Sequence, residues 1–346
     1  LTKLTSGSYN TAVGADACDE LTTGSSNTAV GTEALQKTTT GSNNAAVGYQ
    51  ALEENTTGGG NTALGKEALA ANTTANFNTG LGYQALETNT TGASNTAVGA
   101  DALFANTTAD NNTAVGTSAL AANTTGADNA SFGKDSMVSN TTGSHNTALG
   151  LGALASNTTA DNNTAIGRSA LLLNTTGAGG VAVGANALDA NTTGTRNTAI
   201  GQDSLGANTT GGDNVAIGNS ALEANTTASN NTAVGRIALL ANTTGSDNNA
   251  FGYGALQANT TGTDNTALAK QALFSNTTGS YNTAVGDRAL QANTTASGNV
   301  SVGSDSMYNN TTGSSNVAVG ADALKSNTIG ADNTAIGKVC LDANTT

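Results

Sequence analysis

The chain has 346 residues, a formal net charge of −13, only 3% aromatic residues, and neither Pro nor Trp. Its acidity argues against a nucleic-acid backbone or an anionic membrane surface as a partner. The scarcity of large side chains excludes a conventional core built from them. No apolar run approaches the roughly 18 residues that span a bilayer, so we expect no membrane contact by this segment.

A glycine recurs every seventeen residues along the chain, from Gly14 to Gly337, and the series is broken only at Ala269. No insertion or deletion interrupts the twenty copies. Such regularity requires a geometric constraint, which a stack of repeats provides because each unit contacts its neighbours. We therefore expect residues 1–346 to form a single repeat array, part of a longer chain and without terminal caps.

Numbered from its first Asn, each repeat follows the template N-T-A-V-G-x-x-A-L-x-x-N-T-T-G-x-x. Position 4 is always a large apolar residue, and position 9 is nearly always Leu. Two apolar anchors per repeat predict a ladder of core residues that continues from coil to coil. Its representatives are Val13, Val30, Ile166, Ile200, Ile217 and Ile336 at position 4, and Leu35, Leu52, Leu222 and Leu324 at position 9.

Thr, Val and Ile at positions 2 and 4 favour a β-strand and project to one face, while the small residue at position 3 projects to the other. Asn-Thr-Thr at positions 12 to 14 suits a second short strand. Stretches such as 66–72 also have good helix propensity, which permits one helical turn per coil. Glycine at position 5 allows strained corners, as at Gly14, Gly31, Gly218 and Gly320. Together these features predict an all-β parallel β-solenoid of about twenty 17-residue coils.

Asn occupies position 1 in every repeat except at Gly180. In a stack of identical coils, such Asn side chains can bond their amides up and down the column. The general preference of Asn for turns explains the same pattern nearly as well, so both interpretations stand. The predicted ladder includes Asn27, Asn95, Asn214 and Asn316.

The segment from Gly211 to Leu222, Gly-Gly-Asp-Asn-Val-Ala-Ile-Gly-Asn-Ser-Ala-Leu, resembles the head repeat of trimeric autotransporter adhesins, the YadA-like head. Residues 315–320 and 299–303 are similar to it as well. Related Asn-Thr-Ala-Val-Gly repeats resemble those of bacteriophage and viral tail fibres. The resemblance implies a left-handed parallel β-roll with three chains around one axis. The repeat here is longer than the usual repeat of that family, which bears on the trimer more than on the solenoid.

Residues that carry chemistry are few. The only histidine, His145, occupies a variable position that suits a surface loop, and Cys18 and Cys340 occupy small or apolar core positions. Acidic residues at positions 16 and 17 allow either a calcium site or simply solvated loop acids. They are Asp110, Asp128, Asp161, Asp213, Asp247, Asp264 and Asp332. We expect no catalytic residue, no cofactor and no metal.

Two sets of residues are candidates for surface recognition. Thr at positions 13 and 14 is almost unbroken, which suggests an ordered array that binds ice; self-pairing of Thr across coils is the alternative. Tyr49, Tyr83 and Tyr253 share position 6 and suit a ligand surface.

From these patterns we expect a non-enzymatic extracellular fibre segment, the shaft or head of a trimeric adhesin or a phage tail fibre that mediates surface attachment. It would lie on a bacterial cell surface or a virion appendage. A homotrimer or other homo-oligomer is the expected assembly, and a cell-surface receptor or glycan the expected target. The alternatives are an ice-binding solenoid and a subunit of a self-assembling extracellular filament.

Overall fold

The computed structural model describes all residues from 1 to 346. It is all-β, with twenty parallel three-residue strands spaced about 17 residues apart and no helix, so no segment forms a membrane-spanning helix. The predicted parallel β-solenoid is confirmed. The chain divides into two compact units, residues 1–176 and 177–346, each containing ten strands.

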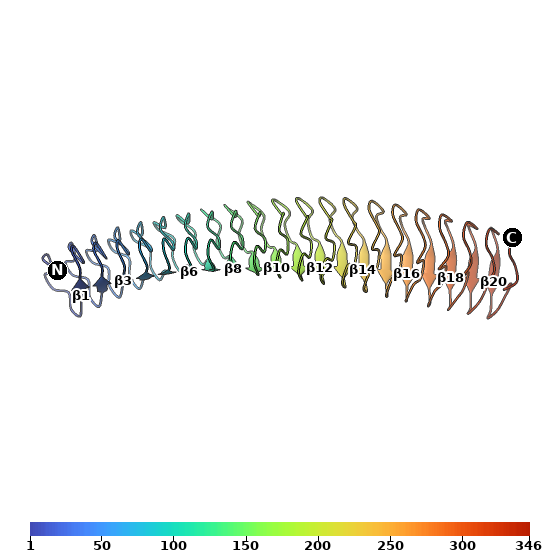
Figure 1. The fold of residues 1–346 in the computed structure, drawn as a ribbon, viewed down its shortest axis with the longest axis horizontal. Helices are drawn as coiled ribbons and strands as arrows, with labels where there is room; N and C mark the ends of the chain where they lie inside the picture. The colour runs from blue at the N-terminus through green and yellow to red at the C-terminus, as the bar shows by residue number, and fades with distance from the viewer. The chain divides into compact units, whose positions relative to one another are not determined.

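Each unit stacks its strands in chain order, one strand per coil (Figure 1). The strands of the first unit are β1 (Thr11–Val13), β2 (Thr28–Val30), β3 (Ala45–Val47), β4 (Thr62–Leu64), β5 (Thr79–Leu81), β6 (Thr96–Val98), β7 (Thr113–Val115), β8 (Ala130–Phe132), β9 (Thr147–Leu149) and β10 (Thr164–Ile166). Those of the second are β11 (Val181–Val183), β12 (Thr198–Ile200), β13 (Val215–Ile217), β14 (Thr232–Val234), β15 (Asn249–Phe251), β16 (Thr266–Leu268), β17 (Thr283–Val285), β18 (Val300–Val302), β19 (Val317–Val319) and β20 (Thr334–Ile336).

Backbone hydrogen bonds join neighbouring coils well beyond the strands. In the coil that begins at Asn214, the Val215 amide donates to the carbonyl oxygen of Asn231 at 2.8 Å, in the next coil. The Leu222 amide donates to the carbonyl oxygen of Ala238 at 3.0 Å. The Asn-Thr-Thr segment is not a strand, yet its Thr226 amide bonds forward in the same way, at 3.1 Å. Hydrogen bonds distributed around the coil keep each residue directly above the residue at the same position of the next coil.

The core is narrow and is lined by small residues at position 3. Leu35, Leu52, Leu222 and Leu324 at position 9 are fully buried, together with Ala at positions 3 and 8. At Gly80, which occupies position 3, an added Cβ would lie 3.3 Å from Cγ of Leu69. Position 3 therefore packs directly on the leucine column, and a larger side chain has no room there.

The expectation that the aliphatic residues at position 4 fill the roll is wrong. The strand alternates, so burying position 3 turns position 4 outward. Ile217 faces outward on the strand that carries the buried Ala216. Of the predicted residues, Val30 is half-buried and the others are exposed: Val13, Ile166, Ile200, Ile217 and Ile336.

The helical turn that the sequence permits is not formed. In the stretch 66–72, Glu67 and Leu69 have φ angles of 58° and 55°, in the left-handed region. An α-helix requires negative φ at successive residues, so these two residues prevent it. The Leu69 amide instead donates to the carbonyl oxygen of Ala85 in the next coil at 2.9 Å. Stacking has thus overridden local helix propensity.

The glycines at position 5 are required for two reasons. Gly14, Gly31, Gly218 and Gly320 have φ between 133° and 140°, a region essentially limited to glycine. A Cβ added at Gly218 would also lie 2.7 Å from the carbonyl carbon of Gly235 in the next coil. Both the corner and the close stacking of coils depend on the missing side chain.

Ala269 is the one residue that breaks this series, and its φ of 129° places it in the same glycine-only region. We expect Ala269→Gly to stabilise the second unit by about 1 kcal/mol, since relief of strain exceeds the added entropy of the unfolded chain. The shift of the urea unfolding midpoint measures this gain.

Ala267→Gly, two residues earlier at the buried position 3, is the matched control and should destabilise, because it removes a packed methyl group. An unchanged or lower midpoint for Ala269→Gly would contradict the strain assigned to this corner.

Candidate functional site

Two columns of buried Asn side chains run through each unit. In the column at position 1, the side-chain Oδ1 of Asn214 accepts a hydrogen bond from the backbone amide of Asn231. The backbone amide of Asn214 donates in turn to Asn197 Oδ1, and both distances are 3.0 Å. The predicted ladder residues Asn27, Asn95 and Asn316 make the same bond to the Asn of the preceding coil, at 2.9 Å. All four predicted ladder residues are fully buried.

The second column lies at position 12, where Asn225 Nδ2 donates to Asn208 Oδ1 at 2.9 Å. The two columns meet at the carbonyl oxygen of position 15. Ala228 O accepts from Asn214 Nδ2 at 2.9 Å and from Asn225 Nδ2 at 3.0 Å. These Asn residues therefore form the polar half of the core and are not available to an external ligand.

The outer face of the strands carries ranks of apolar residues from position 4, which are exposed or half-buried. Leu64 is 51% exposed, while the neighbouring Ala63 at position 3 is buried. Thr or Val at position 2 lies beside them on the same face, with β12 to β14 paired in strict register. Contiguous rows of exposed apolar residues are typical of an interaction surface.

The Thr ranks at positions 13 and 14 differ from each other. At position 13 the side chains are half-buried, and Thr226 Oγ1 donates to the carbonyl oxygen of Thr243 at 3.2 Å. Thr209 makes the equivalent bond to Thr226 at 3.0 Å. Position 14 is exposed along the chain. Only the hydroxyls of position 14 therefore remain fully presented to water.

The tyrosines at position 6 lie on the surface as part of cationic and aromatic ranks. Lys66 Nζ lies 5.6 Å from the ring centroid of Tyr83, and the Arg236 guanidinium lies 5.9 Å from that of Tyr253. Tyr49 precedes Lys66 in the same rank and is exposed. Tyr49 and Tyr83 belong to the first unit and Tyr253 to the second.

The titratable residues are dispersed. His145 lies on the surface with Nε2 3.6 Å from Asp128 Oδ2. Cys18 is buried with a free thiol whose pKa is raised by burial, and Cys340 is also free. Nowhere in residues 1–346 are three or more His, Cys, Asp or Glu side chains grouped to hold a metal ion.

Several Asp residues of positions 16 and 17 instead bond to neighbouring coils. Asp110 and Asp161 each accept a backbone amide hydrogen bond of 2.6 Å from the preceding coil. Asp213 pairs with Arg196, whose hydrogen bond lowers the pKa of the Asp213 carboxyl.

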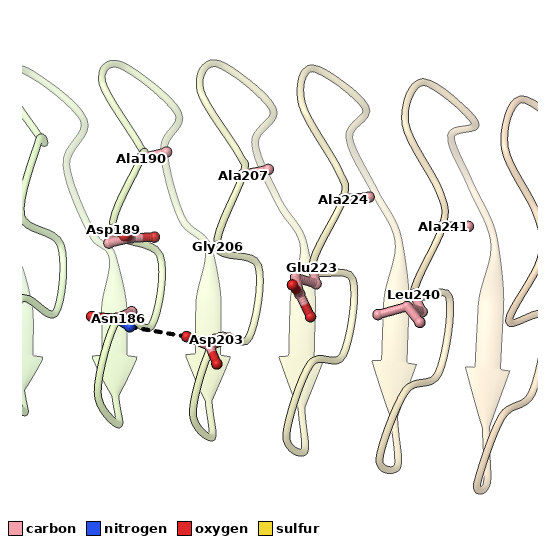
Figure 2. A pocket seen from close by; sticks show the side chains of 10 residues that line it. All are labelled: Asn186, Asp189, Ala190, Asp203, Gly206, Ala207, Glu223, Ala224, Leu240 and Ala241. Carbon is pink, nitrogen blue, oxygen red and sulfur yellow. Dashed lines mark hydrogen bonds between the residues drawn. The ribbon is translucent and has the colours of Figure 1, made fainter.

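A surface hollow of about 690 Å³ in the second unit has an acidic lining (Figure 2). It forms where Gly206 supplies no side chain at position 10, between Asp189 and Glu223 in the coils on either side. Asp203 also lines it and accepts a hydrogen bond of 3.0 Å from Asn186 Nδ2. Burial raises the pKa of the Asp189 carboxyl, and the charge of Asp203 raises it further.

Another hollow, of about 550 Å³, lies in the first unit over Gly59 and Gly60. Asn43, Asn76 and Phe77 are among the residues that line it, and none of its lining side chains is charged. The sequence signal for both hollows is a glycine at a position that elsewhere carries a side chain. The sequence analysis missed them, because a missing side chain opens a hollow only when the neighbouring coils are stacked beside it.

Comparison of the sequence with protein-family models finds no match, and comparison with curated proteins finds none either. The fold defines the chain as a β-solenoid repeat protein. Its resemblance to adhesin head and tail-fibre repeats stays a prediction based on the motif.

The buried Asn column leads to a direct test. Asn214→Ala removes the acceptor of the Asn231 amide and a donor to Ala228, so we expect it to lower the free energy of unfolding by about 2–3 kcal/mol. Asn219→Ala, an exposed Asn in the same coil, is the control and should change it by less than about 0.5 kcal/mol.

Chemical denaturation of the two variants gives the comparison. If Asn214→Ala lowers the free energy of unfolding as little as Asn219→Ala does, the buried carboxamide is dispensable and the ladder is contradicted.

Proposed function

We propose that the chain is a non-enzymatic structural segment of an extracellular fibre, an adhesin or tail-fibre shaft that self-associates and mediates surface attachment. The observation that carries this proposal is the apolar rank at position 4, exposed or half-buried, which repeats from coil to coil on the outside of both units. A bacterial cell surface or a virion appendage is the setting that the resemblance supports.

A second copy of this chain is the partner that fits the exposed face. The rank repeats once per coil, so a partner must share the same coil rise to keep its side chains in register over many coils. Another copy meets this requirement at every coil. Association would cover residues such as Leu64, Ile217 and Phe251, whose exposure to water is unfavourable. The resemblance favours three copies.

The rest of the architecture suits a mechanical role. Each coil bonds to its neighbours through the backbone and through buried Asn side chains, and this favours stiffness. The variable positions then present surface groups repeatedly, which favours multivalent attachment.

Light scattering coupled to size exclusion tests self-association. We expect the wild-type chain to form a defined homo-oligomer and the triple variant Ile200→Lys, Ile217→Lys and Phe251→Lys to be a monomer, because the added charges resist burial. The control carries the same three charges on the exposed position 14, as Thr193→Lys, Thr210→Lys and Thr244→Lys, and should keep the wild-type mass.

A monomeric wild-type chain, or a triple variant that still assembles, would contradict the proposal. Growth without limit would support the self-assembling filament.

Ice binding is the second candidate, favoured by Thr ranks at position 14 that are exposed and repeat once per coil. If it operates, the wild-type chain shows thermal hysteresis, and the variant with Lys at residues 193, 210 and 244 loses much of it. The variant with Lys on the strand face then serves as the control. Absence of hysteresis in the wild-type chain would exclude ice binding.

A further inference from the structure

One place in the first unit differs from every other coil. The repeat that begins at Asn44 ends in Gly59 and Gly60 at positions 16 and 17, and no other repeat has glycine at both. The coils on either side carry side chains there, at residues 42–43 before and 76–77 after. The missing side chains leave the hollow of about 550 Å³ described above, which we call the double-glycine notch.

Phe77 provides an apolar wall for the notch. Phe77 is 71% exposed, which is costly for a phenyl ring and has no explanation in the packing of the coil. A Cβ added at Gly60 would lie 2.8 Å from Cδ1 and 3.0 Å from Cε1 of this ring. The ring therefore lies over Gly60, where glycine alone leaves it room.

Polar groups surround the ring. Asn76 Oδ1 accepts a hydrogen bond of 2.7 Å from the backbone amide of Gly59, and this bond fixes the carboxamide. Asn76 Nδ2 makes no hydrogen bond within the protein. The side chain of Asn43 is exposed and makes none either, and the hydroxyls of Thr40 and Thr57 lie exposed at the same notch. The notch thus offers both donors and acceptors beside one aromatic face.

This combination selects a class of ligand. A charged ligand would find no opposite charge in the lining, and a purely apolar one would leave the amide and hydroxyl groups without partners. A pyranose ring has an apolar C–H face and a rim of uncharged hydroxyls, which match the phenyl face and the surrounding amides.

We propose that the double-glycine notch is a binding subsite for an uncharged sugar residue of a surface glycan. The proposal deepens the attachment function given above and rests on it for its biological purpose. Phe77 stacks on the sugar ring, Asn43 and Asn76 bond its hydroxyls, and the two glycines provide the space. A single subsite of this size binds weakly, with a Kd on the order of millimolar.

Saturation-transfer NMR on the full chain, with the methyl glycosides of glucose, galactose, mannose and N-acetylglucosamine as probes, tests the subsite. We expect transfer to at least one glycoside at about 10 mM, given the expected weak affinity. Phe77→Ala should reduce the transfer by about fivefold or more, because it removes the stacking face.

Gly60→Ser provides a second variant that folds readily, since Ser occupies position 17 with similar φ at Ser26 and Ser94. It fills the notch and should reduce the transfer as strongly as Phe77→Ala. Tyr281→Ala is the matched control: Tyr281 is an exposed aromatic at the same position, but the preceding coil carries side chains at residues 263 and 264, so no such notch is present. It should leave the transfer unchanged.

Absence of transfer to all four glycosides, or transfer that survives Phe77→Ala, would overturn the subsite. If the wild-type oligomer is intact in that case, the inference fails alone and the proposed self-association stands. A monomeric wild-type chain that still binds a glycoside through Phe77 would contradict the proposed self-association and leave the sugar subsite standing.

Discussion

The structure depends on the bonding of buried carboxamides to those of the coils above and below. Most coils place two Asn side chains inside, and both donate to the carbonyl oxygen of position 15, as at Ala228. A buried amide without partners would be costly, so the Asn side chains of one coil depend on polar groups at the same positions of its neighbours. These groups are usually Asn, and in one coil Thr38 accepts a hydrogen bond of 3.3 Å from Asn55 Nδ2. This mutual requirement explains why the period of seventeen residues never varies, because an insertion in one coil would displace both columns.

The narrow core sets the other constraints. Ala at position 3 and Leu at position 9 leave no space for a larger pair, as the contact of Gly80 with Leu69 shows. To point its side chain inward while its amide bonds to the next coil, Leu69 adopts a left-handed φ of 55°, which is unfavourable for a leucine. Stacking compensates for this strain at each coil, and the glycines of position 5 bring the coils close enough to stack.

The sequence predicted the solenoid and the glycine corners because each of these arises from a constraint repeated at fixed spacing. It offered the Asn ladder beside a turn preference of Asn, and the buried side-chain hydrogen bonds favour the ladder. It did not reveal which face of the strand is inside. Alternation along a strand such as β13 cannot decide this, since Val215 and Ile217 suit a buried face as well as Ala216 does, and only the width of the coil selects the alanine. Helix propensity in 66–72 gave a wrong expectation because it is local, whereas the coil is held by bonds between coils. The two surface hollows each depend on several stacked coils at once, so no single repeat could predict them.

The inward residues are committed to the stack, so any binding specificity belongs to the outer strand face and to the variable positions. The most direct test of the account is deuterium exchange of the Asn side-chain amides, followed by NMR in the folded chain. We predict that the Nδ2 protons of Asn214 and Asn225 exchange as slowly as the backbone amides of β13, because both are buried and bonded. Exchange as fast as that of the exposed Asn219 would contradict the central role of the ladder.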